Sequence, residues 1–196
     1  MIIFGASGHG KVVLSANRKE TKFFFDDNPS ITRFRKLQVH VYDANFEKEE
    51  TLVVAIGDNR IRHIIVQKIK HAFTTVIAQS SLIDRSVNIG EGSQLLHGVI
   101  IQSDTHIGRH TIVNTGATID HDCSVGDFCH IAPNATLCGD VSVGEGTLIG
   151  AGSIIIPGIK IGKWCTIGAG SVVLNDVTDH STVVGNPGRI TVVNEQ

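Results

Sequence analysis

One histidine of this chain stands between two acidic residues, in the segment Asp120-His121-Asp122. An imidazole accepts protons more readily when a neighbouring carboxylate orients the ring and stabilises its charged form. His121 is therefore a candidate general base, and Asp122 is a candidate for the acid that orients it. A histidine in a polar turn is also an ordinary solvated residue, so the residue types alone leave both interpretations open.

A second group of candidates lies near the N-terminus, where the segment Gly5-Ala6-Ser7-Gly8-His9-Gly10 follows the short apolar segment Met1–Phe4. Glycines let backbone N–H groups and a helix N-terminus approach a pyrophosphate. The next apolar segment ends in Asp26-Asp27, and a carboxylate there can accept a hydrogen bond from a ribose hydroxyl. The glycine order G-x-x-G-x-G differs from the dinucleotide-binding fingerprint G-x-G-x-x-G. The alternative interpretation is that these glycines only form a structural tight turn.

The elements that would position this second group are short. We expect strands at residues 1–4, 22–25 and 51–56 and helices at residues 11–19 and 60–70, with Gly57-Asp58-Asn59 breaking the last strand from its helix. This order of elements is the nucleotide-binding βαβ pattern, in which a strand, a glycine loop, a helix and a second strand are followed by an acidic residue. The unit is too small for a full dinucleotide fold, which argues against NAD-linked chemistry.

The rest of the chain repeats every six residues. Every sixth position from Ile83 to Val173 is aliphatic, which makes sixteen positions without an insertion. Two residues before each aliphatic position stands a small or β-branched residue. Residues two apart on a strand point to the same face, so both side chains lie on one face. The remaining residues, often led by glycine, turn a corner. Three units close one triangular coil, and the stacked coils form a parallel β-helix filled with aliphatic side chains.

This register positions the candidate residues on the β-helix. His121 lies on a corner with its side chain outward, and His130 faces outward from a strand on the next face. Three of the four cysteines occupy inward positions, where a buried thiol is expected rather than a catalytic or metal-binding one. Histidines on such a prism can alternatively bind zinc, as in hexapeptide-repeat carbonic anhydrases. The candidates for that alternative are His97, His106, His110, His121 and His130.

Composition narrows the class of protein. The chain has 17 Lys+Arg against 19 Asp+Glu, a net charge of −2, which favours neither nucleic acid nor an anionic membrane. Its first residues lack the basic flank and apolar stretch typical of a signal peptide, and no apolar segment approaches the roughly 20 residues that span a bilayer. We expect a soluble cytoplasmic protein. Residues 1–76 hold 20 of the 36 charged residues, and residues 77–178 hold 15 of the 21 glycines. This shift predicts two domains, 1–76 and 77–196.

The order of motifs resembles one family over essentially the whole chain. The motifs are GASGHG, FFDDN, AIGDN, NTGATIDHDC, GDFCHIAPNATLCGD and GNPGR. In these the chain is similar to the PglD/NeuD-type sugar acyltransferases. The resemblance implies an α/β Rossmann-like N-terminal subdomain that holds a nucleotide-linked sugar, followed by a left-handed parallel β-helix. It also implies acetyl-CoA as co-substrate, no metal, and a homotrimer with active sites between neighbouring subunits. The outer faces show no decisive apolar stripe that would predict the trimer independently.

The resemblance further implies roles for single residues. His121 matches the family's general base, Asp122 the acid that orients it, and Gly139 the position whose backbone N–H faces the thioester carbonyl. The implied substrate-binding residues are Gly8, His9, Gly10, Asp26, Asp27, Gly57, Asn59, Asn114 and His130. The acetyl-CoA candidates are Gly139, Leu148, Ala151, Lys163 and Arg189. Of these, Lys163 and Arg189 would meet the phosphates unless they are ordinary surface cations.

The resemblance thus implies an acetyl-CoA-dependent N-acetyltransferase of bacterial surface-glycan biosynthesis. Its acceptor would be the 4-amino group of a nucleotide-linked 4-amino-4,6-dideoxy sugar, which attacks the thioester directly while His121 takes the proton. General-base help of this kind contributes about 10²–10⁴ in rate. O-acetylation of sialic acid or another sugar is one alternative, and a non-catalytic β-helix scaffold is another.

Overall fold

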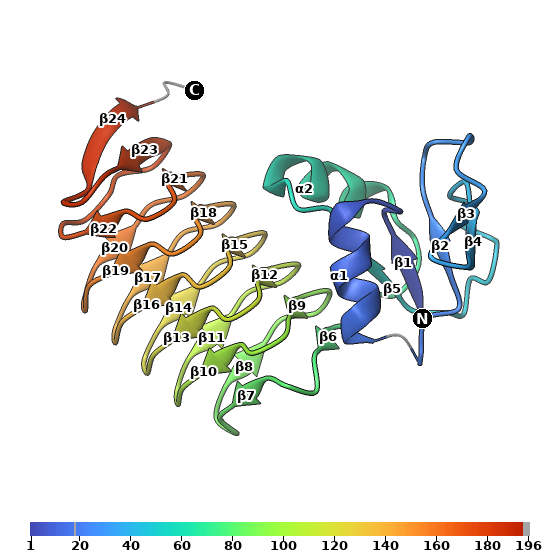
Figure 1. Ribbon diagram of the computed structural model, residues 1–196, viewed down its shortest axis with the longest axis horizontal. Helices are drawn as coiled ribbons and strands as arrows, with labels where there is room; N and C mark the ends of the chain where they lie inside the picture. Colours follow the sequence, from blue (N-terminus) through green and yellow to red (C-terminus); the bar gives the residue numbers. More distant parts are fainter. Residues whose placement is uncertain (18, 194–196) are drawn as a thin grey trace.

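The computed structural model describes residues 1–17 and 19–193 and shows an α/β unit beside a triangular prism (Figure 1). The α/β unit contains a five-stranded sheet of order β3-β4-β2-β1-β5, in which only β3 runs antiparallel to its neighbour. Its strands are β1 (Ile2–Phe4), β2 (Phe23–Phe25), β3 (Arg33–Phe34), β4 (Leu37–His40) and β5 (Leu52–Val54). β1, β2 and β5 are buried on both faces, which explains their uninterrupted apolar sequences.

Two helices flank this sheet, α1 (Gly8–Ala16) and α2 (Asn59–Lys68). The prediction of a helix from residue 11 to residue 19 was wrong at both ends. Gly10 lies in the first turn of α1, and a Cβ there would lie 2.1 Å from the carbonyl oxygen of Gly5, so the early start requires glycine. α2 begins at the N-cap Asp58, whose Oδ1 accepts the Ile61 N–H at 2.8 Å. Within the described residues, no helix is both long and apolar enough to cross a bilayer.

The prism has three parallel sheets, here called the first, second and third faces. The first face holds β6 (Val76–Ile77), β9 (Gln94–Leu95), β12 (Ile112–Val113), β15 (His130–Ile131), β18 (Leu148–Ile149), β21 (Thr166–Ile167) and β23 (Ser181–Val184), with β24 (Arg189–Val193) antiparallel at its edge. The second face holds β7 (Leu82–Ile83), β10 (Ile100–Ile101), β13 (Thr118–Ile119), β16 (Thr136–Leu137), β19 (Ile154–Ile155) and β22 (Val172–Val173). The third holds β8 (Asn88–Ile89), β11 (His106–Ile107), β14 (Ser124–Val125), β17 (Ser142–Val143) and β20 (Lys160–Ile161).

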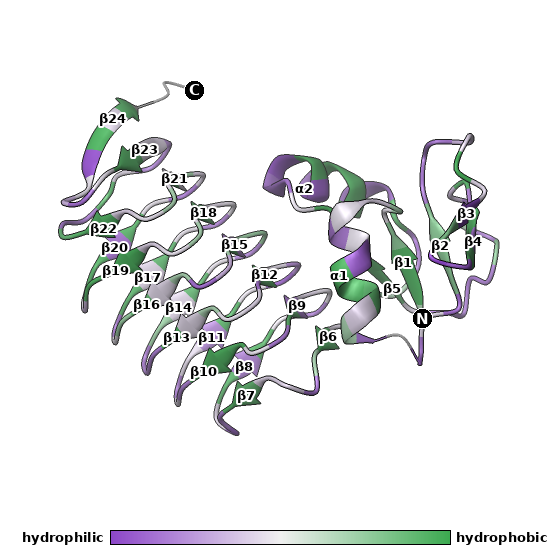
Figure 2. Ribbon diagram, in the orientation of Figure 1, coloured by the Kyte–Doolittle hydropathy of each residue, from purple (hydrophilic) through white to green (hydrophobic). Residues whose placement is uncertain are grey.

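The predicted six-residue register is confirmed. The aliphatic positions from Leu95 to Val173 are all at most 3 % exposed and form one continuous core. Cys123, Cys129 and Cys165 are buried in that core as free thiols. In Figure 2 the apolar segments follow the strands of the prism and of the N-terminal sheet. Each corner therefore projects from a rigid, regularly stacked frame.

The N-terminal unit packs on the first face of the prism. Val76, Leu96 and Ile112 of the prism share an apolar cluster with Ile3 and Phe24 of the sheet. The outward side chains of β6 and β12 are apolar, which makes this face the favourable place to dock. The first coil consequently stays open, and its inward residue Ile77 is 48 % exposed. At the other end β23 and β24 extend the first face.

Candidate active site

The loop after β5 meets the first face of the prism at His130. The Nδ1 of His130 lies 3.1 Å from the carbonyl oxygen of Gly57, and the side-chain amide of Asn114 lies 3.0 Å from Nε2. A carbonyl oxygen only accepts, so Nδ1 carries the hydrogen and Nε2 accepts from the amide. Burial, followed by the positive charge of Arg62, lowers the pKa of His130 to about 4. This imidazole is therefore neutral at physiological pH.

His9 reaches the same place from the first turn of α1. Its Nε2 lies 2.9 Å from Oε1 of Gln94, whose own amide donates to the Val54 carbonyl at 2.9 Å. The rings of His9 and His130 have centroids 6.2 Å apart, and burial lowers the pKa of His9 as well. Gly8 has open space where a side chain would stand, so the helix N-terminus beside His9 is accessible to an anion.

Two of the predicted nucleotide-site residues have structural partners. The Asp26 carboxylate accepts the Ala6 N–H at 2.8 Å and the Asn28 N–H at 2.9 Å, so it holds the glycine loop. Asn59 donates to the Gly146 carbonyl at 3.0 Å and thereby docks the start of α2 on the prism. Asp27 is exposed. Roles of these residues toward a ligand stay predictions.

Arg62 was missed at the sequence level and is the most deeply buried charge of the described residues. Its guanidinium donates to the carbonyl oxygens of His110, Phe128 and Cys129 of the prism at 2.8–3.0 Å, and to that of Ile56 at 2.8 Å. Burial lowers its pKa to about 10, which leaves it charged at neutral pH. Position 62 lies on the same helix face as buried Val66, and that spacing was the available signal. Arg62 fixes the loop that carries Gly57 against the prism.

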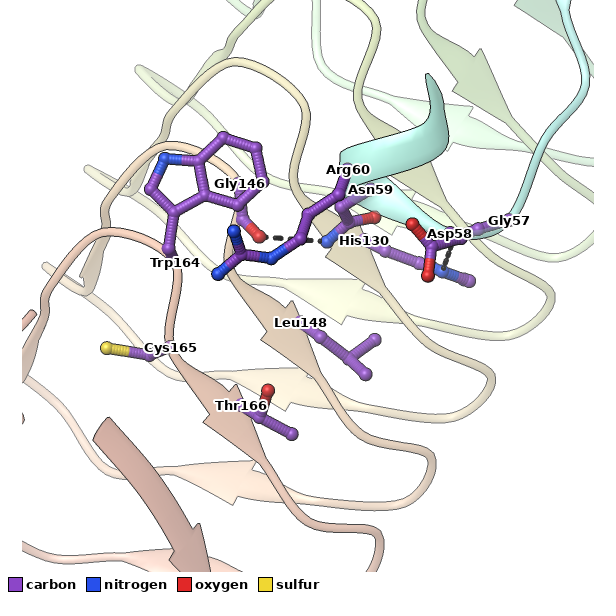
Figure 3. A pocket seen from close by; sticks show the side chains of 10 residues that line it. All are labelled: Gly57, Asp58, Asn59, Arg60, His130, Gly146, Leu148, Trp164, Cys165 and Thr166. Carbon is purple, nitrogen blue, oxygen red and sulfur yellow. Dashed lines mark hydrogen bonds between the residues drawn. The ribbon is translucent and has the colours of Figure 1, made fainter. Parts of the chain in front are cut away.

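A cavity of about 420 Å³ opens beside His130, between the start of α2 and the strands β15, β18 and β21 (Figure 3). Its lining consists of Gly57, Asp58, Asn59, Arg60, His130, Gly146, Leu148, Trp164, Cys165 and Thr166. The sequence predicted four of these as ligand-binding residues, namely Gly57, Asn59, His130 and Leu148. Arg60 and Trp164 were not predicted, because they are far apart in the chain and only the docking of α2 brings them together.

The proposed base and its acid lie on the corner between the second and third faces. Nδ1 of His121 lies 2.7 Å from Oδ2 of Asp122, and both side chains are more than half exposed. The hydrogen bond to Asp122, together with the charge of Asp120, raises the pKa of His121. With Nδ1–H directed at the carboxylate, Nε2 is free to accept a proton.

Gly139 lies directly above the His121 ring in the next coil. A Cβ at position 139 would lie 2.7 Å from Cε1 and 2.8 Å from Nε2 of that ring. The glycine therefore leaves the space that the imidazole occupies. Within the described residues its N–H donates to no acceptor, as the predicted role toward a thioester carbonyl requires.

The predicted residues form separate groups within one chain. His121 is not among the residues that line the cavity beside His130. Ala151 is exposed on the corner between the first and second faces, and Lys163 is exposed on the corner between the third and first. Arg189 lines a different cavity of about 340 Å³ near the end of the prism. In residues 1–17 and 19–193, no group of three or more His, Cys, Asp or Glu could hold a metal ion, so the zinc alternative has no ligand set there.

Two family models match the chain. The model described as the PglD N-terminal domain matches residues 1–69. The model described as bacterial transferase hexapeptide (six repeats) matches residues 104–139, 122–157 and 140–175. No curated protein sequence matches significantly.

Solved structures match over nearly the full length. A variant of perosamine N-acetyltransferase from Caulobacter crescentus, in complex with CoA and GDP-perosamine, is 35% identical with a TM-score of 0.92, covering 97% of this chain and 96% of that one. The acetyltransferase domain of PglB from Neisseria gonorrhoeae, in complex with acetyl coenzyme A, is 31% identical with a TM-score of 0.89, covering 97% and 98%. WeeI from Acinetobacter baumannii is 30% identical with a TM-score of 0.90 and the same coverage.

Proposed function

The chain belongs to the PglD-type family of left-handed β-helix sugar acetyltransferases, and on this premise we propose that it acetylates the 4-amino group of a nucleotide-linked 4-amino-4,6-dideoxy sugar. It is an acyltransferase that uses acetyl-CoA. The relative solved with CoA and GDP-perosamine makes that sugar the first acceptor to test. The observation that carries the proposal is the His121–Asp122 pair beneath Gly139, with a free ring nitrogen facing solvent.

The chemistry is a direct transfer between two bound substrates. The unprotonated amine attacks the thioester carbonyl carbon, a C–N bond forms, and the C–S bond to CoA breaks. Nε2 of His121 accepts the proton that the amine loses and returns it to the departing sulfur, while Asp122 stabilises the charged ring. The N–H of Gly139 stabilises the negative oxygen that develops on the carbonyl.

The group around His130 lies on the acceptor side in this proposal. His9 and the open helix N-terminus at Gly8 would meet the sugar diphosphate, where positive dipole and N–H groups favour anions. Burial keeps His130 neutral, and Gly57 and Asn114 fix the orientation of its ring, so it orients a sugar by hydrogen bonding and does not compete for the amine proton.

The proposal includes a homotrimer, because within one chain the base His121 does not line the cavity beside His130. The outward column of the second face consists of apolar and β-branched residues, namely Leu82, Ile100, Thr118, Thr136, Ile154 and Val172. The outward column of the third face is polar: Asn88, His106, Ser124, Ser142 and Lys160. Burying the second face around a three-fold axis would remove exposed Leu82 and Ile154 from water.

Such a trimer would bring the His121 corner of one subunit beside the corner of the next subunit that carries Asn114. Co-expression of His121→Ala with His130→Ala tests this. If each site takes its base from one subunit and its cleft from the next, random assembly of two inactive chains restores about a quarter of the sites. Mixed trimers without activity would show that both residues act within one subunit.

The product identifies the reaction class. Incubation with acetyl-CoA and GDP-linked 4-amino sugar should give a product heavier by one acetyl group in mass spectrometry. An amide survives mild base, whereas an ester formed by O-acetylation is hydrolysed, so base treatment separates the two reactions. No acetylated product from any amino or hydroxyl sugar would contradict the proposed activity. The reaction belongs in the cytoplasm, because acetyl-CoA is an intracellular co-substrate.

A further inference from the structure

Gln94 of β9 is a fully buried polar residue that the proposed chemistry does not use. We propose that Gln94 is a positioning residue: it fixes the ring of His9 so that Nδ1 of that ring accepts a hydrogen bond from a hydroxyl group of the acceptor sugar. The inference rests on the proposed acetyl transfer and deepens its acceptor side, because it names the group of the sugar that His9 recognises.

The place of Gln94 in the first face shows that packing alone does not explain this residue. Its outward side chain stands between those of Val76 and Ile112 in the neighbouring coils. Both of these are fully buried in the apolar cluster shared with the N-terminal sheet. An apolar side chain at position 94 would extend that cluster, whereas a buried amide costs free energy unless hydrogen bonds satisfy it. The amide is therefore explained by the groups that it binds.

Two hydrogen bonds fix the orientation of the Gln94 amide. Its nitrogen Nε2 donates to the carbonyl oxygen of Val54 at 2.9 Å, and a carbonyl oxygen only accepts. The amide oxygen Oε1 therefore faces Nε2 of His9, at 2.9 Å. Because an amide oxygen also only accepts, Nε2 of His9 carries the hydrogen. One buried side chain thus links the end of β5 to the first turn of α1 and selects the tautomer of His9.

The same tautomer leaves Nδ1 of His9 as a bare acceptor. Among the described residues it has no hydrogen-bond partner, and it is not one of the buried unsatisfied ring atoms, which both belong to His110. It is therefore open to a ligand. Burial and the positive charge of Arg62 on α2 lower the pKa of His9. His130 of β15 faces the ring with its centroid 6.2 Å away and is itself neutral, so His9 is neutral at physiological pH.

A neutral ring with a bare nitrogen selects a hydrogen-bond donor. A phosphate offers acceptors, so it gains more from the N–H groups of the helix start beside Gly8. The ring of His130 is not available, because both of its nitrogens already have partners. The sugar amine needs its lone pair for the thioester and loses its proton to His121 in the proposed reaction. The hydroxyl groups of the sugar are the donors that remain for His9.

Calorimetric titration tests this recognition without turnover. The ligands are the tightest-binding member of a GDP-, UDP- and dTDP-linked 4-amino sugar panel and its analogues that lack one hydroxyl group. Removal of the recognised hydroxyl should weaken binding to the wild type about 10-fold, the loss of one hydrogen bond. In His9→Phe the same removal should have no effect, because the ring no longer accepts.

Two variants on the same strand separate positioning from packing. Gln94→Leu leaves the His9 ring free to turn and should lose most of the discrimination between the sugar and its deoxy analogue. The matched control Leu96→Ala removes apolar contacts from the same interface between the two units and keeps the amide, so it should discriminate like the wild type. Equal discrimination in Gln94→Leu and the wild type would overturn the role of Gln94.

The protonation of the ring gives a readout that a structural role would not change. Nitrogen NMR of isotope-labelled histidine, with the His9 signals identified by their loss in His9→Phe, should show a hydrogen on Nε2 and none on Nδ1. In Gln94→Glu a carboxylate beside the ring should raise the pKa of His9. Below that pKa Nδ1 carries a hydrogen and no longer accepts, so sugar binding by this variant should weaken as the pH falls from about 8.5 to 6.5. Binding by the wild type should stay constant over the same range.

A hydrogen on Nδ1 in the wild type would overturn the inference, and so would an analogue series that loses as much affinity in His9→Phe as in the wild type. Discrimination between the analogues without turnover on any sugar would refute the proposed function and leave this inference standing. Turnover on an amino sugar without any discrimination by His9 would do the reverse.

Discussion

Replacing Gly139 by alanine tests whether the position of the His121 ring matters to catalysis. The new methyl group would lie 2.7 Å from Cε1 of His121, whereas ordinary contact begins at 3.4 Å. The ring must therefore retreat by about 0.7 Å, and a displacement of about 1 Å at a reacting group costs on the order of 10²-fold in rate. Gly139 does not have a positive φ, so alanine introduces no backbone strain. His121 is 57 % exposed and can swing toward solvent, so we expect Tm to stay unchanged.

The assay is kcat for thiol release, measured in Gly139→Ala, in His121→Ala and in the double variant. If the alanine acts by displacing the base, it has no further effect once His121 is gone, because the two changes disable one group. An equal loss of rate from Gly139→Ala in both backgrounds would refute the steric argument. Unchanged activity in the single variant would refute the role of His121 itself.

Three more results follow from the geometry. Because Asp122 raises the pKa of His121, Asp122→Asn should move the acidic limb of the kcat/KM profile to lower pH while lowering the maximum, and an unmoved limb would assign it to another group. Arg62→Met removes the donor to the carbonyls of Ile56 in the N-terminal unit and of His110 and Phe128 in the prism, and it should cost about 3–5 kcal/mol of unfolding free energy in urea, against less than 1 for Lys68→Met on the exposed face. His110 is buried among aromatic rings with a pKa of about 4, and within residues 1–17 and 19–193 neither ring nitrogen has a hydrogen-bond partner. Below its ordinary value of 6.5 the unfolded chain binds the proton first, so stability falls by about 3 kcal/mol as pH drops to 4. His110→Phe should remove that part of the pH dependence and leave the part that belongs to His130; equal urea midpoints at pH 7 and 4.5 in the wild type would contradict it.

The β-helix could be predicted from sequence because its signal is local and repeated. Each aliphatic position from Leu95 to Val173 fills the same kind of site, so one register explains all of them. The corner position of His121 follows from the same register. The meeting of His130, Asn114 and Gly57 required the family resemblance, since no spacing joins a loop of the α/β unit to the prism.

The features that could not be predicted from the sequence depend on how the two units dock. Arg62 is a charged residue on a helix and becomes significant only because three carbonyls of the prism surround it. The N-terminal unit covers a lateral face because Val76 and Ile112 point outward there. The six-residue pattern describes the inward positions and does not predict this contact. The cavity wall formed by Arg60 and Trp164 arises from the same docking.

The reaction to establish is acetyl transfer from acetyl-CoA to a nucleotide-linked 4-amino sugar with His121 as the base. Thiol release, measured on a panel of GDP-, UDP- and dTDP-linked 4-amino sugars in wild type and His121→Ala, tests it most directly. We expect turnover on one member of the panel and a loss of at least about 100-fold in the variant. Turnover that is indifferent to the substitution, or no turnover on any amino sugar, would contradict it.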